Sequence, residues 1–317
     1  MKNKTLPLLI LAMLLLLGGC GAAQPTSNDP TNPQPLTVVV TTQHLADAVQ
    51  AVAADKVTLR PLLAPGVDPH TYVPTQGDLQ LLRSADLILY NGLHLEAQML
   101  RVFEQIASRD EAMVVAVAEQ INPEQLLSWE PEAGMPYDPH IWHDASLWSE
   151  AVGVIATTLS SKDPANAATY NANAARYQAE LAELHTAILE QVARIPTERR
   201  MLVTAHDAFS YYGRAYGLNV EAIQGVSTAS EASAADIQAL TALILERQVP
   251  AIFVESTVSP RTIEAVVAAV QAAGQELRIG GELFADALGA PGTPEGSYLG
   301  MMRHNLTTIV TALAEGV

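Results

Sequence analysis

Cysteine is almost absent from the sequence: Cys20 is the only one among 317 residues, so no disulfide can form within the chain. Basic residues are also scarce, since 17 lysines and arginines face 34 aspartates and glutamates, for a formal net charge of −17. Nucleic acid is therefore not an expected partner, because its phosphates require a basic protein surface. An acidic surface of this kind suits cations better.

The sequence also lacks an apolar run long enough to cross a membrane. The run at Leu8–Leu17 has ten residues, and no segment reaches the roughly 18 that indicate a spanning helix. Lys2 and Lys4 precede this run and small residues follow it, which is the arrangement of a secretory signal peptide. We therefore expect residues 1–19 to be a signal peptide that directs the chain out of the cytoplasm.

The residues that follow the apolar run end in the only cysteine and read Leu17-Gly18-Gly19-Cys20. They resemble the bacterial lipobox, in which the signal peptidase cuts before the cysteine and the cysteine is then acylated. A plain signal peptide followed by an incidental cysteine is the alternative. Residues 20–35 are polar and rich in proline, as in a flexible tether. The sequence thus predicts an extracytoplasmic protein that is anchored to the cell membrane through a lipidated Cys20.

Motifs of common enzyme classes are missing as well. The sequence has no HExxH zinc motif, no GxxxxGK[ST] phosphate loop and no nucleophile elbow around a serine. The glycines between Gly289 and Gly296 lack the spacing of a phosphate loop and are expected to form turns before the last helix. We therefore expect a binding protein and not an enzyme.

Short β-rich segments alternate with helical periodicity from residue 36 onward. In the first half, strands are expected at 36–41, 57–63, 86–90 and 113–116, and helices at 43–54, 75–83, 97–107 and 146–160. In the second half, strands are expected at 201–205, 218–223, 251–255 and 276–279, and helices at 208–216, 233–247, 260–273 and 297–314. This alternation predicts an α/β fold with two lobes, 36–162 and 196–317, each with a parallel sheet flanked by helices.

One long helix is expected between the lobes, at 163–195. Asp163 suits the N-cap and Pro164 the first helical position. Apolar residues then recur every three or four positions on one face: Tyr170, Ala174, Tyr177, Leu181, Leu184, Ile188 and Val192. Residues 164–194 would extend roughly 46 Å at about 1.5 Å per residue, too far for one lobe. We predict a backbone helix that joins both lobes; a coiled coil is the alternative, but no partner segment is present.

Three of the eight histidines have surroundings that suggest a metal site. The tripeptide Asp-Pro-His occurs at 68–70 and again at 138–140, where the aspartate could accept from the imidazole or brace the turn. A third histidine follows the strand at 201–205, at the carboxyl end where open α/β sheets bind ligands. With one carboxylate in a comparable position, the candidate ligands are His70, His140, His206 and Asp286. Such a set suits Zn²⁺ and, with expanded coordination, Mn²⁺ or Fe²⁺.

Six longer stretches contain these residues in a specific order. They read TTQHLADAV, DPHTYVPTQGDLQLLRSADLILYNGLHLE, DPHIWHD, TAHDAFSYYGRAYGL, AIFVESTVSP and LFADALGAPGTPEGSYLGMMRHNL. Together they resemble the solute-binding lipoproteins of ABC importers for zinc and manganese, the cluster 9 (A-I) or TroA-like family, over residues 36–317. The resemblance implies two α/β lobes joined by a backbone helix, with metal buried between them on His70, His140, His206 and Asp286. It also implies an ABC permease and its ATPase as partners, and we expect the protein to be a monomer.

Zn²⁺ is the expected metal, with Mn²⁺ as the alternative. His206 stands where manganese-selective relatives tend to have a glutamate, and three imidazoles favour zinc. Against strict zinc specificity, the segment 119–139 has none of the histidines that zinc-dedicated relatives often carry before the second ligand. Neutral imidazoles should bind metal less well as the pH falls toward about 6.5.

The remaining candidates surround the ligands. Glu255 and His143 could contact the ligands, and His143 is a possible substitute for His140 as a ligand. We expect packing or surface roles for His44, His94, His185 and His304.

Two other functions are consistent with parts of the pattern. An extracellular zinc metallohydrolase would need an open coordination position and a general base. A siderophore- or cobalamin-binding protein of the same architecture would need a wide cleft lined with aromatic residues or arginines. The sequence has no feature that bears on the cell-adhesion role sometimes proposed for such lipoproteins.

Overall fold

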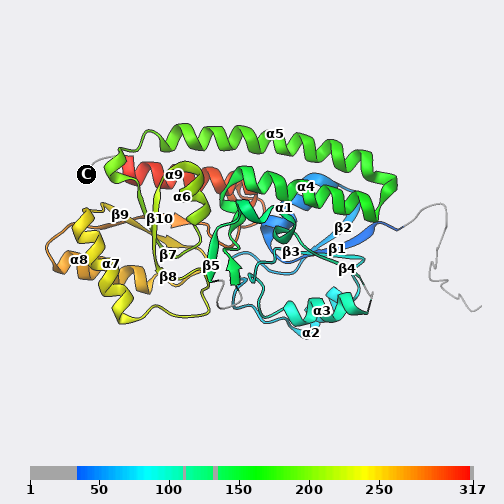
Figure 1. The fold of residues 1–317 in the computed structure, drawn as a ribbon, viewed down its shortest axis with the longest axis horizontal. Helices are drawn as coiled ribbons and strands as arrows, with labels where there is room; N and C mark the ends of the chain where they lie inside the picture. Colours follow the sequence, from blue (N-terminus) through cyan, green and yellow to red (C-terminus); the bar gives the residue numbers. More distant parts are fainter. Residues whose placement is uncertain (1–33, 110–111, 131–134, 315–317) are drawn as a thin grey trace, which may run out of the picture. The chain divides into compact units, whose positions relative to one another are not determined.

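The computed structural model describes residues 34–109, 112–130 and 135–314 (Figure 1). The predicted signal peptide, Cys20 and nearly all of the predicted tether lie outside these ranges. Within them, no helix is both long and apolar enough to cross a membrane.

The N-terminal half is built on a four-stranded parallel sheet in the order β2-β1-β3-β4. Its strands are β1 (Leu36–Val40), β2 (Val57–Pro61), β3 (Leu87–Tyr90) and β4 (Met113–Ala116), and its helices are α1 (Gln43–Ala53), α2 (Gln76–Arg83), α3 (Leu100–Ser108) and α4 (Ala145–Lys162). Side chains alternate between the two faces: Val39 joins the core under α2 and α3, whereas Val38 and Val40 join the core under α1 and α4. The sheet is therefore buried on both faces, as parallel sheets are.

The C-terminal half has two parallel pairs of strands, β7 with β8 and β9 with β10, and β7 lies next to β9. The strands are β7 (Met201–His206), β8 (Asn219–Gln224), β9 (Ala251–Glu255) and β10 (Arg278–Leu283), and the helices are α6 (Ser210–Tyr216), α7 (Ala234–Arg247), α8 (Arg261–Ala272) and α9 (Tyr298–Ala314). The helices α7 and α8 cover a separate apolar core on one face.

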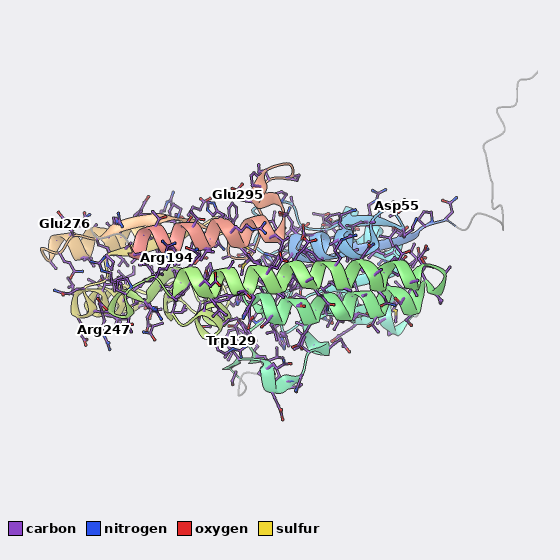
Figure 2. All side chains as sticks on the ribbon, turned by 90° about the horizontal axis from the view of Figure 1, so that it is seen from above. Asp55, Trp129, Arg194, Arg247, Glu276 and Glu295 are labelled. Atoms are coloured by element: carbon purple, nitrogen blue, oxygen red, sulfur yellow. The ribbon has the colours of Figure 1, made fainter. Side chains whose placement is uncertain are left out.

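The helix α5 (Ala167–Val192) links the two halves in sequence and extends along one side of both, where it packs against α1, α4, α6 and α9 (Figure 1). All seven residues of the predicted apolar stripe are buried. They join one large core that contains residues of both halves, such as Val38 and Phe253. Seen from above, α5 lies beside α4, and charged side chains such as Asp55 and Glu276 project from the surface (Figure 2).

The long helix is shorter than predicted. Residues Pro164–Asn166 form a separate 3-10 turn, and the α-helix of 26 residues that follows is about 39 Å long at 1.5 Å per residue. Asp163 does precede the turn, and its carboxylate accepts from the side chains of Asn166 and Tyr170.

Two further regions differ from the expectations. The last strand is β10 at 278–283, not 276–279, because its pairing with β9 continues past Ile279 through a shift of register at Gly280 and Gly281. Gly281 has φ 142, which favours glycine. An antiparallel hairpin of β5 (Ser128–Glu130) and β6 (Met135–Tyr137) was not predicted at all.

Single 3-10 turns connect several of these elements. They lie at Ala118–Gln120, Pro123–Gln125, Ile141–His143, Thr197–Arg199 and Pro294–Gly296. The other predicted strands and helices are confirmed within a few residues. The fold is thus α/β, with parallel sheets flanked by helices and one long helix; the lobe boundaries stay a prediction.

Candidate metal centre

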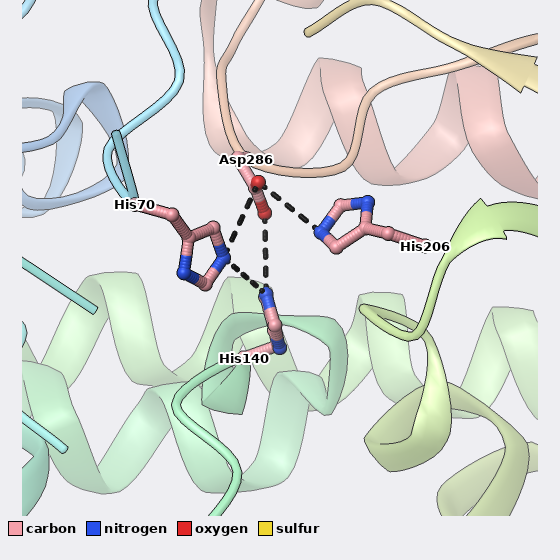
Figure 3. A group of neighbouring side chains, drawn as sticks. All are labelled: His70, His140, His206 and Asp286. Carbon is pink, nitrogen blue, oxygen red and sulfur yellow. Dashed lines mark hydrogen bonds and ion pairs between the residues drawn. The ribbon is translucent and has the colours of Figure 1, made fainter. Parts of the chain in front are cut away.

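Four side chains from distant parts of the sequence converge on one point (Figure 3). His70 lies in the loop after β2, and His140 lies between β6 and the turn that precedes α4. His206 is the last residue of β7, and Asp286 follows β10 by three residues. Each offers one ligand atom, these atoms all lie within 4.8 Å of one another, and all four residues are buried. The N-terminal and C-terminal halves therefore contribute two residues each.

The spacing of these atoms suits a tetrahedral metal ion. Nε2 of His70 lies 3.2 Å from Nε2 of His140 and 3.7 Å from Oδ2 of Asp286. The Asp286 carboxylate also lies 3.4 Å from Nε2 of His140 and 3.2 Å from Nε2 of His206. In a tetrahedral site with bonds of about 2.0–2.1 Å, neighbouring ligand atoms are about 3.3 Å apart. These four distances between ligand atoms, from 3.2 to 3.7 Å, lie on both sides of that value.

Carboxylates behind two of the histidines fix the orientation of their rings. Oδ1 of Asp138 accepts hydrogen bonds from the backbone N–H of His140 at 2.9 Å and from its Nδ1 at 2.7 Å. Glu255 accepts from Nδ1 of His206 with one oxygen, and from the backbone N–H of His206 and of Ala205 with the other. In both cases the carboxylate occupies Nδ1 and directs Nε2 into the centre, as partners of metal-binding histidines do.

Three of the converging atoms lie at ion-pair distances of 3.2–3.7 Å from their neighbours but make no hydrogen bond of good geometry among the described residues. They are Nε2 of His206 and both carboxylate oxygens of Asp286, all fully shielded from solvent. Buried polar atoms are rarely left unpaired, because their desolvation is costly. A divalent cation would satisfy them, so the donor set fits a transition metal such as Zn²⁺.

Burial and neighbouring charge act in opposite directions on the histidines. Burial is the largest influence on His70 and lowers its pKa to about 3. Burial opposes protonation of His140 as well, but Asp138 and Asp286 outweigh it and raise the pKa of His140 to about 9. His140 is therefore protonated at neutral pH when no metal is bound, and His70 is neutral.

The C-terminal half contributes a pair of opposite charges. Burial disfavours the charged form of His206, but Glu255 and Asp286 outweigh it and hold the pKa of His206 well above its ordinary value. Burial also disfavours the Asp286 carboxylate, yet His206 and His140 hold its pKa well below the ordinary range. A metal ion that bound at this centre would therefore displace protons from His140 and His206 and not from Asp286.

Trp142 connects the two halves next to the centre. Its indole N–H donates to the backbone carbonyl of Ala285, the residue before Asp286, at 2.8 Å, and Tyr298 donates to the carbonyl of Trp142 at 2.7 Å. The ring lies against His140 with the centroids 5.2 Å apart, and it is fully buried. One side chain thus supports a histidine from one half and the aspartate from the other.

The other histidines lie outside the convergent group. His143 packs on Phe209 with ring centroids 4.2 Å apart, and His44 stacks on Trp142 at 4.8 Å. Both are buried, and burial lowers the pKa of His44 to about 3 and that of His143 well below 6.5. His304 interacts with the carbonyl of Glu282 at 3.0 Å. His185 lies against Tyr216, and the backbone of His94 has a positive φ of 67.

The sequence is similar to those of known proteins over most of its length. A family model described as "Zinc-uptake complex component A periplasmic" matches residues 38–312. The chain belongs to this family. Zinc-binding protein TroA of Treponema pallidum is 49% identical over 277 residues, which are 87% of this chain and 88% of that protein. The manganese-binding lipoprotein MntA of Bacillus subtilis is 41% identical over 96% of this chain and 97% of that protein.

A solved structure of this zinc-uptake family agrees with the fold. The periplasmic zinc-binding protein TroA from Treponema pallidum matches with a TM-score of 0.85 and 48% identity, over 89% of this chain and all of that chain. The zinc-uptake component A family consists of solute-binding proteins of transporters and not of enzymes.

Sequence reasoning about this family member overlooked two residues near the centre. Trp142 stands two residues after His140, and its position within DPHIWHD was the only available signal. Thr228 lies in a loop remote in sequence from every candidate ligand, and no local pattern points to it. By contrast, the aspartate of each Asp-Pro-His tripeptide was singled out, and the structure shows that Asp138 performs both suggested tasks.

Proposed function

We propose that this protein binds Zn²⁺, with Mn²⁺ as an alternative cargo, on His70, His140, His206 and Asp286 and delivers it to an ABC importer. The observation that carries the proposal is the convergence of three imidazole nitrogens and one carboxylate from both halves on one buried point. In this proposal the two halves are lobes, at 36–162 and 196–317, joined by the helix at 163–195. Release would require the permease to separate them, because each lobe holds only two ligands.

The choice of zinc as the favoured cargo follows from the donor set. Three nitrogens and one oxygen are softer than the oxygen-rich sets that suit Mn²⁺, and the distances between ligand atoms fit tetrahedral zinc. The relatives support both metals, since TroA is named for zinc and MntA for manganese.

The cellular setting follows from the family and from the N-terminal sequence. A substrate-binding protein of an ABC transporter acts outside the cytoplasm, with the permease and its ATPase as partners. We further infer that Cys20 is lipidated and holds a monomer at the membrane through the tether at 20–35. The lipobox-like sequence and the lipoprotein names of relatives such as MntA support this.

The other functions considered fit the centre less well. A hydrolytic zinc keeps a position for water, whereas four protein ligands would fill a tetrahedral shell. A siderophore or cobalamin would need a wide opening, whereas these four side chains converge on a space for one ion. Family membership favours neither alternative, because the relatives are metal-binding proteins of ABC transporters.

Native mass spectrometry combined with competitive titration by Zn²⁺ and Mn²⁺ tests the proposal. We expect one metal ion per chain and tighter binding of zinc. His206→Ala should weaken zinc binding at least about 100-fold, because loss of even an outer partner of a ligand weakens binding 10- to 100-fold. His304→Ala removes a histidine outside the centre and serves as the matched control. Equal zinc affinity of both variants would refute the assignment.

A further inference from the structure

One side-chain hydrogen bond joins the two halves beside the metal centre. The hydroxyl of Thr228 donates to Oδ2 of Asp68 at 2.6 Å, across 160 positions of sequence. Asp68 lies in the loop after β2, two residues before His70, and Thr228 lies in the loop between β8 and α7. Both side chains are half-buried. The bond therefore connects the segment that carries one ligand to the opposite half.

On the N-terminal side, Asp68 is tied directly to His70. Its Oδ1 accepts from the backbone N–H of His70 at 2.8 Å, while Oδ2 accepts from the hydroxyls of Thr71, at 3.0 Å, and Thr228. A shift of this carboxylate would therefore shift the backbone of the ligand.

On the C-terminal side, the loop that carries Thr228 is anchored to the strand pair that ends in His206. The loop begins after Gln224, which lies opposite His206 in the parallel register of β7 and β8. The Gln224 amide donates to the carbonyl of Ser230 at 3.2 Å, and the backbone N–H of Asp207 donates to the carbonyl of Gly225 at 3.3 Å. These bonds hold the loop on the strand pair that ends in His206.

The aspartates of the two Asp-Pro-His tripeptides have different hydrogen-bond partners. Asp138 uses one oxygen for both the backbone and the ring of His140. Asp68 holds only the backbone of His70, and its second oxygen is left for Thr71 and Thr228. Both tripeptides contact the opposite half: Tyr211 donates to the backbone carbonyl of Asp138 at 2.9 Å, whereas Thr228 reaches the side-chain carboxylate of Asp68.

We propose that Thr228 is a positioning residue for metal binding: its hydroxyl holds Asp68, and through it His70, against the ligands of the C-terminal half, and this bond breaks when the lobes separate to release the ion. The inference rests on the proposed metal-binding function. A hydrogen bond to a carboxylate contributes on the order of a tenfold change in an equilibrium constant. Because the bond is lost on opening, its removal should appear mainly in the rate of metal release.

The test compares zinc release from purified wild type, Thr228→Val and Thr71→Val, mixed rapidly with excess chelator. Valine keeps the shape of threonine and removes the hydroxyl. Thr71 donates to the same oxygen of Asp68 but belongs to the same half, so Thr71→Val is the matched control. We expect about tenfold faster release from Thr228→Val, little change in Thr71→Val, and recovery of the slow rate in Thr228→Ser. Because each valine removes one hydrogen bond to the same carboxylate oxygen, both variants should lose a similar small amount of unfolding free energy without metal, which separates positioning from general destabilisation.

Two results would overturn the inference. The first is release from Thr228→Val at the wild-type rate. The second is equal acceleration in Thr228→Val and Thr71→Val, which would show that only the local setting of Asp68 matters. Failure of the proposed function would give a different result, because the wild-type protein would then bind no zinc and would have none to release to the chelator.

Discussion

Zinc binding should release about two protons per ion at pH 7. Burial opposes protonation of His140 and His206, but their carboxylate neighbours outweigh it, so the pKa of His140 is about 9 and that of His206 lies well above 6.5. Both rings therefore carry a proton that must leave before Nε2 can bind metal. His70, with its pKa lowered to about 3 by burial, and Asp286, with its pKa held well below the ordinary range, release none.

The size of the change in zinc affinity with pH follows from the linkage between proton release and metal binding. Each proton that must leave changes the apparent affinity about tenfold per pH unit, so two protons give about 100-fold weaker binding at pH 7 than at pH 8. The sequence alone placed this competition near pH 6.5, and the carboxylates behind the rings move it upward. Affinity should therefore keep rising until the pH passes the pKa of His140, about 9.

Isothermal titration calorimetry in two buffers of different ionisation enthalpy counts the protons directly. Glu255→Gln removes a charge that raises the pKa of His206 and should lower the count toward one. Glu282→Gln removes an exposed carboxylate on the neighbouring strand β10 and is the matched control. A count of zero at pH 7, with the same affinity at pH 7 and pH 8, would refute the reasoning.

Two further predictions concern the stability of the protein. Trp142→Phe removes the donor to the carbonyl of Ala285 and should lower the free energy of unfolding by about 1–3 kcal/mol in urea denaturation, and weaken zinc binding. Trp129→Phe, at a partly exposed position of β5 away from the centre (Figure 2), should do neither and is the control. The unfolding free energy of the metal-free protein should be highest near pH 6.5. This free energy falls as the pH rises toward 9, because His140 and His206 keep protons in the folded state that the unfolded chain releases. It also falls as the pH drops toward 3, because the unfolded chain takes up protons that three buried histidines do not accept in the folded state: His44, His70 and His143. Chemical denaturation of the metal-free protein from pH 4 to 9 measures this, and a curve that rises steadily between pH 6.5 and 9 would contradict it.

Periodicity was sufficient for most of the fold. The stripe from Tyr170 to Val192 requires one face of a single helix to be buried, and every residue of it is buried. The boundaries depend on features without a periodic signal. Gly280 and Gly281 indicate a loop locally, yet pairing with β9 carries the strand through them as a bulge. The short hairpin of β5 and β6 has three residues in each strand, too few for an alternating pattern to be visible.

Much of the candidate centre was accessible because three of its four residues have a local signature. A repeated tripeptide contains His70 and His140, and the end of a strand identifies His206. Contacts across the centre have no such signature. Neither the bond from Thr228 to Asp68 nor that from Trp142 to Ala285 follows from sequence spacing, because both depend on how the two halves dock.

The large core shared by both halves has a consequence for how the chain acquires its structure. The last helix, α9, packs against α1 and α5, so the beginning and the end of the folded region meet in one apolar interior. During synthesis, α1 and the long helix emerge with part of their apolar surface still uncovered, and only residues 298–314 complete it. Contacts so distant in sequence close late, because the intervening loop must first be ordered. A nascent chain that already contains all four metal-centre residues, up to Asp286, would thus still have an open interior.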